Sequence, residues 1–281
     1  MATACTGISI NMRIGIDARM YGEGLGIGRY IAELVGELEE LNDEHAFVIF
    51  LGTSNWDAYT PSSKRFTKVL APYPWYSFSE QVLMPLAIAR QHLDLMHFPH
   101  FNVPLYVPCP FVVTIHDLIM IRHPLSSRNA VTTRHPLMYW LKHAAFRFVI
   151  WRAVCASRRV ITVSQTVKGQ IMDYFSVSEE KVYVALEAAR LMPTCPSGWK
   201  SPVGGAFIFT PGNAYPHKNL EMLIDAFKIF KERYATDLAL VLCGQEDVFR
   251  DRIVKRIGEL GMGSSVIHLG HVSDEDLSCL Y

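Results

Sequence analysis

The sequence lacks several features that mark particular classes of protein. No apolar run approaches the roughly 20 residues of a membrane-spanning helix. The first 11 residues have neither the basic nor the apolar region of a signal peptide, and we expect residues 1–11 to be a disordered extension. The formal net charge is zero and 50% of the residues are hydrophobic, so the composition indicates a globular protein with a sizeable core.

The cysteines form no C-x-x-C pair, and several of them lie in apolar runs. This scatter predicts reduced core thiols in a cytosolic protein and argues against a disulfide framework or a zinc site. No other cluster of residues has convincing metal-ligand spacing, so we expect no metal site. The cysteines concerned are Cys5, Cys109, Cys155, Cys195, Cys243 and Cys279.

Patterns typical of buried strands alternate with helical patterns twice along the chain. The alternation predicts an α/β fold with two Rossmann-like domains, at residues 12–191 and 206–281. Residues 192–205 are rich in Pro, Gly and Ser and predict a linker between them. The second domain is short for this architecture, and the helix begun by Ser273 runs to the last residue. We therefore expect the second domain to be incomplete.

The expected elements are short. In the first domain the patterns predict helices at 29–41 and 79–91, a helix capped by Ser164, and strands at 12–17, 48–51, 66–70, 93–97, 111–115, 160–163 and 182–185. In the second domain they predict strands at 206–210, 238–243 and 265–269, with helices at 218–234 and 248–260.

Residues 207–227 combine three features of an anion site. A short apolar strand ends at Pro211-Gly212, a polar loop carrying Lys218 follows, and a helix with one apolar face begins. Free backbone N–H groups and the positive end of the helix dipole attract anions, and the lysine adds a full charge. The pattern predicts binding of a phosphorylated or nucleotide ligand. The alternative is an ordinary strand-to-helix turn with a solvated lysine.

The motif in this stretch, G-N-x-x-P-x-K-N-L followed by L-I-x-A-F, resembles the start of the second domain of bacterial family 4 glycosyltransferases. The resemblance extends from about Met12 to Tyr281. It implies a GT-B fold, in which two Rossmann-like domains face each other across a cleft. It also implies transfer of a hexose, with mannose as the first candidate, from a nucleotide-diphosphate sugar such as GDP-mannose. The acceptor would be a glycan or a lipid-linked sugar in cell-surface polysaccharide synthesis, with retention of configuration and without a metal.

Two departures from the family pattern bear on activity. Many relatives have an arginine shortly before the lysine, whereas here at most His217 adds charge. The family also carries two glutamates eight residues apart that contact the donor, and no such pair occurs in that context. We read Glu246 and Asp247 as loop and helix-start charges instead. The chain is therefore expected to be inactive alone, and the alternative function is a non-catalytic fragment that binds the nucleotide or the acceptor.

The candidate site residues fall at the ends of strands, where open α/β sheets place their ligands. The resemblance assigns the donor side to Gly212, Asn213, Lys218, Gly270, His271 and Val272. In the first domain, the G-x-G-x-G loop would bring Gly26 and Gly28 close to the donor phosphates, with a packing turn as the alternative.

A histidine at the end of another first-domain strand is the candidate catalytic residue. The resemblance implies that His116 contacts the donor sugar, and the alternative is a structural histidine. Asp117 would orient His116 or cap the turn. His97 and His100 would line the acceptor side or simply pack in a loop. A dehydrogenase or epimerase is disfavoured, because the glycine spacing is not that of a dinucleotide site and the nearest acidic residues lie on the helix.

The charge pattern between Asp117 and Asp173 is one-sided. No acidic residue occurs there, while nine basic residues are interleaved with aromatic ones. A basic, aromatic, amphipathic helix predicts peripheral contact with the anionic inner face of the cell membrane in a cytoplasmic protein. The alternative is a core helix with solvated charges. No nucleic-acid-binding motif accompanies the charges, so we expect no nucleic-acid partner.

Overall fold

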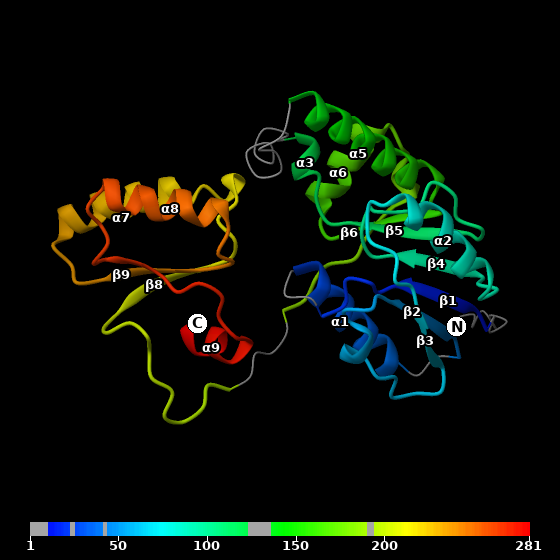
Figure 1. Ribbon diagram of the computed structural model, residues 1–281, viewed down its shortest axis with the longest axis horizontal. Coiled ribbons are helices and arrows are strands. Elements are labelled where there is room, and N and C mark those ends of the chain that lie inside the picture. Colours follow the sequence, from blue (N-terminus) through cyan, green and yellow to red (C-terminus); the bar gives the residue numbers. More distant parts are fainter. Residues whose placement is uncertain (1–10, 23–25, 42–43, 123–135, 190–193) are drawn as a thin grey trace, which may run out of the picture. The chain divides into compact units, whose positions relative to one another are not determined.

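The computed structural model describes residues 11–22, 26–41, 44–122, 136–189 and 194–281. Residues 1–10 of the expected extension and residues 192–193 of the expected linker therefore lie outside the described residues. The chain divides into two compact units, each described here by itself (Figure 1). The first unit joins Met1–Leu118 to Leu141–Glu187, and the second joins Ile119–Trp140 to Ala188–Tyr281. This division places Ile119–Trp140 with the second unit, whereas the sequence placed it in the first domain.

The first unit is built on a seven-stranded parallel sheet. The strand order is β3-β2-β1-β4-β5-β6-β7, so the chain runs outward from β1 in both directions. Reversal of direction at β1 and β4 is the arrangement of a doubly wound sheet, in which ligands bind beyond the carboxyl ends of the strands. The strands are β1 Arg13–Asp17, β2 Ala46–Leu51, β3 Phe66–Leu70, β4 Leu95–Phe98, β5 Phe111–Ile115, β6 Arg159–Thr162 and β7 Val182–Val184.

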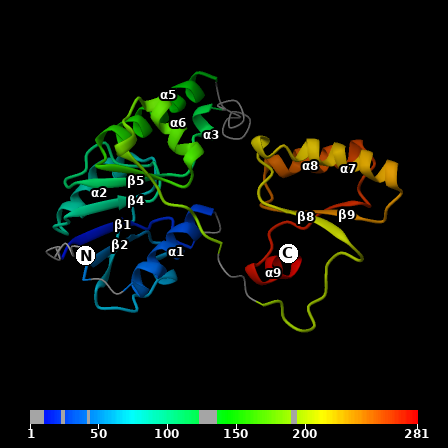
Figure 2. The same cartoon turned by 180° about the vertical axis from the view of Figure 1, so that it is seen from behind.

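Helices connect most of these strands and cover the sheet. α1 packs Ile31 and Val35, four residues apart, onto the apolar side chains of β1 and β2. α5 and α6 lie beside each other on one side of the sheet (Figures 1 and 2). The helices of this part of the chain are α1 Gly26–Glu40, α2 Phe78–Ala89, α3 Ile119–Arg122, α5 Pro136–Ala156 and α6 Gln165–Phe175, with 3₁₀ turns at Trp56–Ala58 and Glu179–Lys181.

The second unit has a three-stranded parallel sheet in the order β10-β9-β8. α7 and α8 lie side by side on one face of this sheet, as both ribbon views show (Figures 1 and 2). The other face carries a smaller cluster around Val203 and Val241. The elements are β8 Phe207–Pro211, a 3₁₀ turn at Pro216–Lys218, α7 Leu220–Tyr234, β9 Ala239–Cys243, α8 Val248–Glu259, β10 Val266–His268 and α9 Asp274–Leu280.

Three helix starts are capped as the sequence predicts. The Ser164 hydroxyl accepts a hydrogen bond from Val167 N at the start of α6, and Ser273 does the same at α9. The Asp247 carboxylate accepts from two backbone N–H groups at the start of α8. The expectation that Asp247 is a helix-start charge is therefore confirmed. The predicted start of the first helix at Arg29 was wrong, because α1 begins at Gly26.

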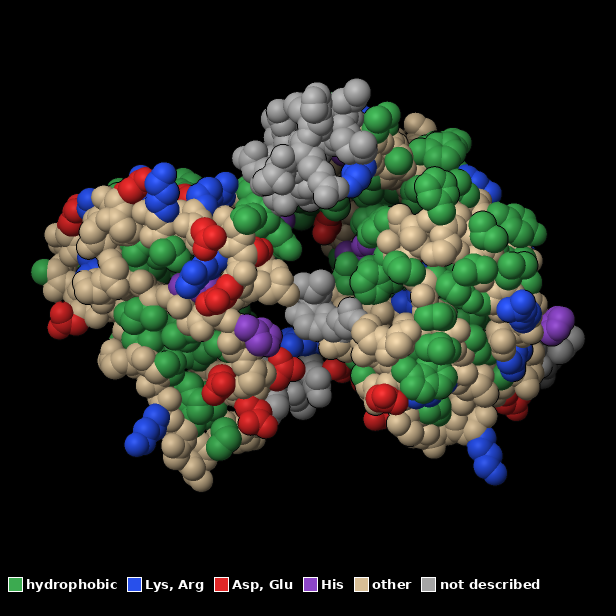
Figure 3. Space-filling view, viewed as in Figure 1, with side chains coloured by type: hydrophobic (Ala, Val, Ile, Leu, Met, Phe, Trp, Pro, Cys, Tyr) green, Lys and Arg blue, Asp and Glu red, His purple; other side chains and the backbone are tan. Residues whose placement is uncertain are grey.

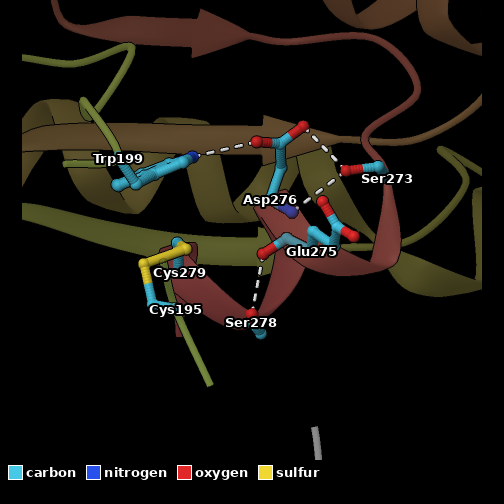
Figure 4. Close-up of a disulfide and its surroundings, with 7 residues drawn as sticks. All are labelled: Cys195, Trp199, Ser273, Glu275, Asp276, Ser278 and Cys279. Atoms are coloured by element: carbon cyan, nitrogen blue, oxygen red, sulfur yellow. Dashed lines mark hydrogen bonds between the residues drawn. A yellow bond between two sulfur atoms is a disulfide. The ribbon is translucent and has the colours of Figure 1, made fainter. Parts of the chain in front are cut away.

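The expectation of reduced cysteines is wrong for one pair. Cys195 and Cys279 form a disulfide that ties the segment before β8 to α9 (Figure 4). Beside it, the Trp199 Nε1–H donates to Asp276 Oδ1 over 2.9 Å. The sequence gives no signal for the pairing because 84 residues separate the two thiols. Of the other described cysteines, Cys243 is buried, Cys109 is half-buried and Cys155 is exposed.

α5 corrects another expectation. Its exposed apolar side chains, such as Trp140 and Phe148, are mixed around the helix with basic side chains such as Lys142 and Arg147, so it is not amphipathic. Membrane contact through this helix stays a prediction. Among the described residues, no helix is long and apolar enough to cross a membrane.

Candidate functional site

Three glycine turns meet at the carboxyl edge of the second sheet. Gly212 follows β8, Gly244 follows β9 and Gly270 follows β10. Gly212 N donates to Cys243 O and Gly244 N donates to Gly270 O, both over 2.9 Å. The turns are thus hydrogen-bonded side by side. The structure brings together Gly212 and Gly270, which the sequence had placed at the donor side from positions 58 residues apart.

Glycine is required in these turns for two reasons. Gly212 and Gly270 have φ of 122° and 74°, a region that side chains with a Cβ rarely adopt. A Cβ on Gly244 would lie 2.6 Å from the carbonyl oxygen of Gly212. The backbones of Gly212 and Gly244 therefore approach more closely than a residue with a Cβ would allow. Sequence reasoning missed Gly244, although a glycine directly after a fully buried strand was the available signal.

Side chains around the turns hold them in place. Asn213 Oδ1 accepts from Gln245 N over 3.0 Å, so the predicted ligand residue Asn213 joins the first turn to the second. His268 Nδ1 accepts from Gly270 N over 3.1 Å, and burial lowers the pKa of His268. His271 is exposed and Val272 half-buried just beyond the third turn.

A carboxylate lies beside the third turn. A Cβ on Gly270 would be 3.3 Å from Glu246 Oε1, and that oxygen lies 3.6 Å from Arg250 Nη2. The sequence treated Glu246 only as a loop charge. Its place next to the turn makes it a candidate acceptor for a ligand hydroxyl.

Lys218 ends the 3₁₀ turn that precedes α7. The residue after it, Asn219, has a left-handed φ of 53°, which turns the chain into the helix. The Lys218 side chain is exposed and has no ion pair with any described residue. A solvent-facing ammonium next to a helix N-terminus can take an anion without first breaking an internal contact.

His116 is held from two sides at the end of β5 in the first unit. Its Nε2 lies 3.0 Å from the carbonyl oxygen of Pro99, and its Nδ1 lies 3.1 Å from Glu187 Oε1. The ring also meets Tyr30 of α1 edge-on, with 4.7 Å between ring centroids. Asp117, the next residue, is exposed. The carboxylate at the ring is therefore that of Glu187, a residue the sequence did not single out.

Comparison with known proteins now identifies the chain. A model of Glycosyltransferase Family 4 matches residues 25–185, more than half of the sequence. The chain belongs to this family. A second model, Glycosyl transferases group 1, matches residues 196–281, so the two matches follow the two expected domains in order.

The chain is similar to O-antigen chain mannosyltransferase RfbU of Salmonella typhimurium, with 23% identity over 274 residues. The alignment covers 94% of this chain and 71% of the relative. Among solved structures, sucrose-phosphate synthase from Thermosynechococcus elongatus has a TM-score of 0.68 at 13% identity and covers 96% of this chain and 73% of that one. Anabaena HepE in complex with UDP and glucose has a TM-score of 0.58 at 15% identity, over 94% and 70% of the two chains.

At these identities the structural likeness establishes the fold, and the fold is GT-B. Another glycosyltransferase, WaaG, gives a TM-score of 0.61 at 12% identity and covers 95% of this chain and 72% of that one. The predicted family and fold class are therefore confirmed. The roles of the individual site residues stay predictions.

In this glycosyltransferase, the glycine loop of the first unit is partly helix. Gly26 is exposed and Gly28 is buried, and both lie in the first turn of α1 rather than in a loop. The N–H groups of a helix's first turn have no partner within the helix. Anion binding by the start of α1 therefore stays a prediction.

His97 is buried and His100 is half-buried. His97 Nε2 lies 2.8 Å from Thr114 Oγ1, inside the sheet, and burial lowers the pKa of both histidines to about 4. The His100 ring is tilted against Phe101 at 3.8 Å. For His97 these contacts favour the alternative of packing over contact with a substrate.

A buried ionic network at the end of β1 was missed altogether. Arg19 Nη2 lies 2.7 Å from Asp17 Oδ2 and 2.6 Å from Glu80 Oε1, and the Arg19 and Glu80 side chains are 2% and 0% exposed. Asn102 Nδ2 donates to Glu80 over 2.7 Å, and Arg19 Nη1 donates to Tyr73 O over 3.0 Å. The network joins the loops at the carboxyl edge of the first sheet, next to the predicted acceptor side.

The surfaces of the two units differ. Lysine, arginine, aspartate and glutamate side chains are mixed over α7 and α8 (Figure 3), where Arg252 pairs with Glu221 and Arg256 with Asp225. On α2 of the first unit, Phe78, Val82 and Leu86 form an exposed apolar stripe at helical spacing.

Among the described residues, no group of three or more histidine, cysteine or acidic side chains could hold a metal ion.

Proposed function

We propose that this glycosyltransferase transfers a hexose, specifically mannose, from a nucleotide-diphosphate sugar to a glycan or lipid-linked acceptor, with retention of configuration. The observation that carries the proposal is the set of three hydrogen-bonded glycine turns, with exposed Lys218 in the loop that follows the first of them. Two similar proteins support the ligand class. RfbU is named an O-antigen chain mannosyltransferase, and HepE is described in complex with UDP and glucose.

The chemistry follows from the charge that leaves with the diphosphate. As the bond between sugar and diphosphate breaks, negative charge develops on phosphate oxygens. The N–H groups of Gly212, Gly244 and Gly270 already donate within the protein. The donors left for phosphate are the first-turn N–H groups of α7, whose start has no side-chain cap. Gly212 and Gly244 hold the turns in a geometry that only glycine allows, and Lys218 adds a full positive charge. In this proposal these groups do the work that a metal ion would otherwise do.

His116 has a separate role in the proposal. From the carboxyl end of β5 it would contact the donor sugar, as residues at that edge of an open α/β sheet commonly contact ligands. Its two ring nitrogens are already oriented by Pro99 and Glu187, so the ring has a defined direction before the substrate arrives.

The first test is calorimetric titration of the chain with GDP-mannose, GDP, UDP-glucose and UDP, without metal. Loss of a charged contact to phosphate costs about 1.5–3 kcal/mol. We expect Lys218→Ala to weaken donor binding by roughly 10- to 150-fold. Lys255→Ala is the matched control, since Lys255 is an exposed lysine on α8 of the same unit. The nucleoside diphosphate that binds by itself, GDP or UDP, identifies the preferred base of the donor.

The outcomes separate the alternatives. Equal affinities for wild type and Lys218→Ala would remove Lys218 from the phosphate site. Binding without transfer to any acceptor would favour the non-catalytic fragment. A folded chain that binds none of the four nucleotides would contradict the proposed donor site.

A further inference from the structure

The His116 ring is contacted by three segments that are far apart in sequence. Pro99 belongs to the loop after β4, Tyr30 to α1, and Glu187 to the segment after β7. His116 is only 17% exposed, whereas Glu187 is 49% exposed.

Hydrogen-bond chemistry decides how the ring is held. A carbonyl oxygen can only accept a hydrogen bond, so Nε2 must carry a proton and donate to the Pro99 carbonyl oxygen. In the neutral ring Nδ1 then has a lone pair. Glu187 faces that nitrogen, and its carboxylate makes a hydrogen bond there when Nδ1 also carries a proton. The group at Nδ1 therefore completes the orientation that Pro99 begins.

We propose that Glu187 is a positioning residue that fixes the His116 ring, between the Pro99 carbonyl and its own carboxylate, for contact with the sugar. The proposal rests on the proposed function of His116. Glu187 does not need to touch the substrate for this role.

The pair contributes little to stability, which makes the proposal testable. Ion pairs with a half-exposed partner contribute little to stability, so Glu187→Ala should fold normally. Glu187→Gln offers a rescue. The glutamine amide can donate to the lone pair of Nδ1 and hold the neutral ring in the same place. Glu180→Ala is the matched control, because Glu180 is an exposed carboxylate on the same unit.

The experiment combines a spectroscopic and a binding measurement on the 281-residue chain. With selectively labelled histidine and tyrosine, we expect nuclear Overhauser contacts between the His116 and Tyr30 rings in wild type, Glu187→Gln and Glu180→Ala. Glu187→Ala should lose them. In calorimetric titrations Glu187→Ala should weaken binding of GDP-mannose by roughly 2- to 10-fold and leave the affinity for GDP unchanged, and Glu187→Gln should recover most of the loss.

The ring contacts can be measured without substrate, so failure of the two proposals can be told apart. If wild type binds no nucleotide sugar, the proposed donor site fails and the ring contacts still test Glu187. Unchanged ring contacts in Glu187→Ala would overturn the inference, and so would a Glu187→Gln variant that behaves like Glu187→Ala.

Discussion

At the scale of single residues, the end of β1 carries the largest concentration of buried charge in the described structure. One arginine, Arg19, faces the two carboxylates of Asp17 and Glu80. Burial raises the pKa of Glu80 even though Arg19 opposes the shift. A buried ionic group is tolerated only when its partners remain, so the consequence of a substitution depends on which partner is removed.

Replacing Arg19 should therefore harm the protein more than replacing Glu80. Arg19→Met leaves two buried carboxylates without a counter-charge, and we expect a loss of about 3–5 kcal/mol in the free energy of unfolding. Glu80→Gln leaves the pair of Arg19 and Asp17 intact and should cost less. Urea unfolding of both variants measures the difference. Glu179→Gln, which removes an exposed pair with Lys168, should change stability by less than about 1 kcal/mol.

The reverse order would contradict this account. If Glu80→Gln proved more damaging than Arg19→Met, the packing of Glu80 against Asn102 and the Tyr76 backbone would matter more than the charge balance.

At the scale of elements, local pattern was a good guide to the strands and helix caps. β5 lies exactly where the apolar run predicted it, and Ser164, Asp247 and Ser273 cap the helices expected after them. These features depend on residues a few positions apart. The start of α1 was misjudged because its glycines were read as loop residues, whereas the buried spacing of Gly28, Ile31 and Val35 continues the helix.

The disulfide is the element-scale feature with the largest expected effect. Cross-linking residues 84 apart restricts the unfolded chain, and the loop-entropy relation gives about 4.5 kcal/mol for a loop of this size. We expect Cys279→Ser, or reductant added to wild type, to lower the free energy of unfolding of the second unit by up to this amount. Fluorescence of Trp199, which donates to Asp276 on α9, reports on the same region.

Cys155→Ser provides the control for the disulfide, since Cys155 is an exposed thiol of the first unit. Its stability should match that of wild type with and without reductant. If reductant leaves wild-type stability unchanged, the pair contributes nothing to the folded state.

At the scale of the whole molecule, the buried histidines link stability to pH. Burial lowers the pKa of His97 from 6.5 to about 4, so the unfolded chain binds more protons than the folded one between these values. Stability therefore rises with pH across this window and is lost on acidification from about pH 6.5 towards pH 4. The shift corresponds to roughly 3 kcal/mol for this residue.

His97→Gln should flatten the pH dependence of the free energy of unfolding between pH 7 and pH 4.5. The slope is the quantity to compare, because the substitution also disturbs the contact with Thr114. His92→Asn is the control, since His92 is exposed and its φ of 49° suits asparagine. Equal slopes in wild type and His97→Gln would show that His97 does not contribute to acid sensitivity.

The sequence alone determined the features that depend on neighbouring residues. These are the alternating strands and helices, the helix caps, the family motif from Gly212 to Lys218, and the positions of His116 and Gly270 after strands. Tertiary structure alone decided which distant groups meet. Glu187 reaches His116 across 71 residues, Glu80 reaches Arg19 across 61, and Cys279 reaches Cys195 across 84. The physical reason is that local periodicity specifies an element and its buried face, whereas the partner of a polar side chain is set by how the strands are ordered in the sheet.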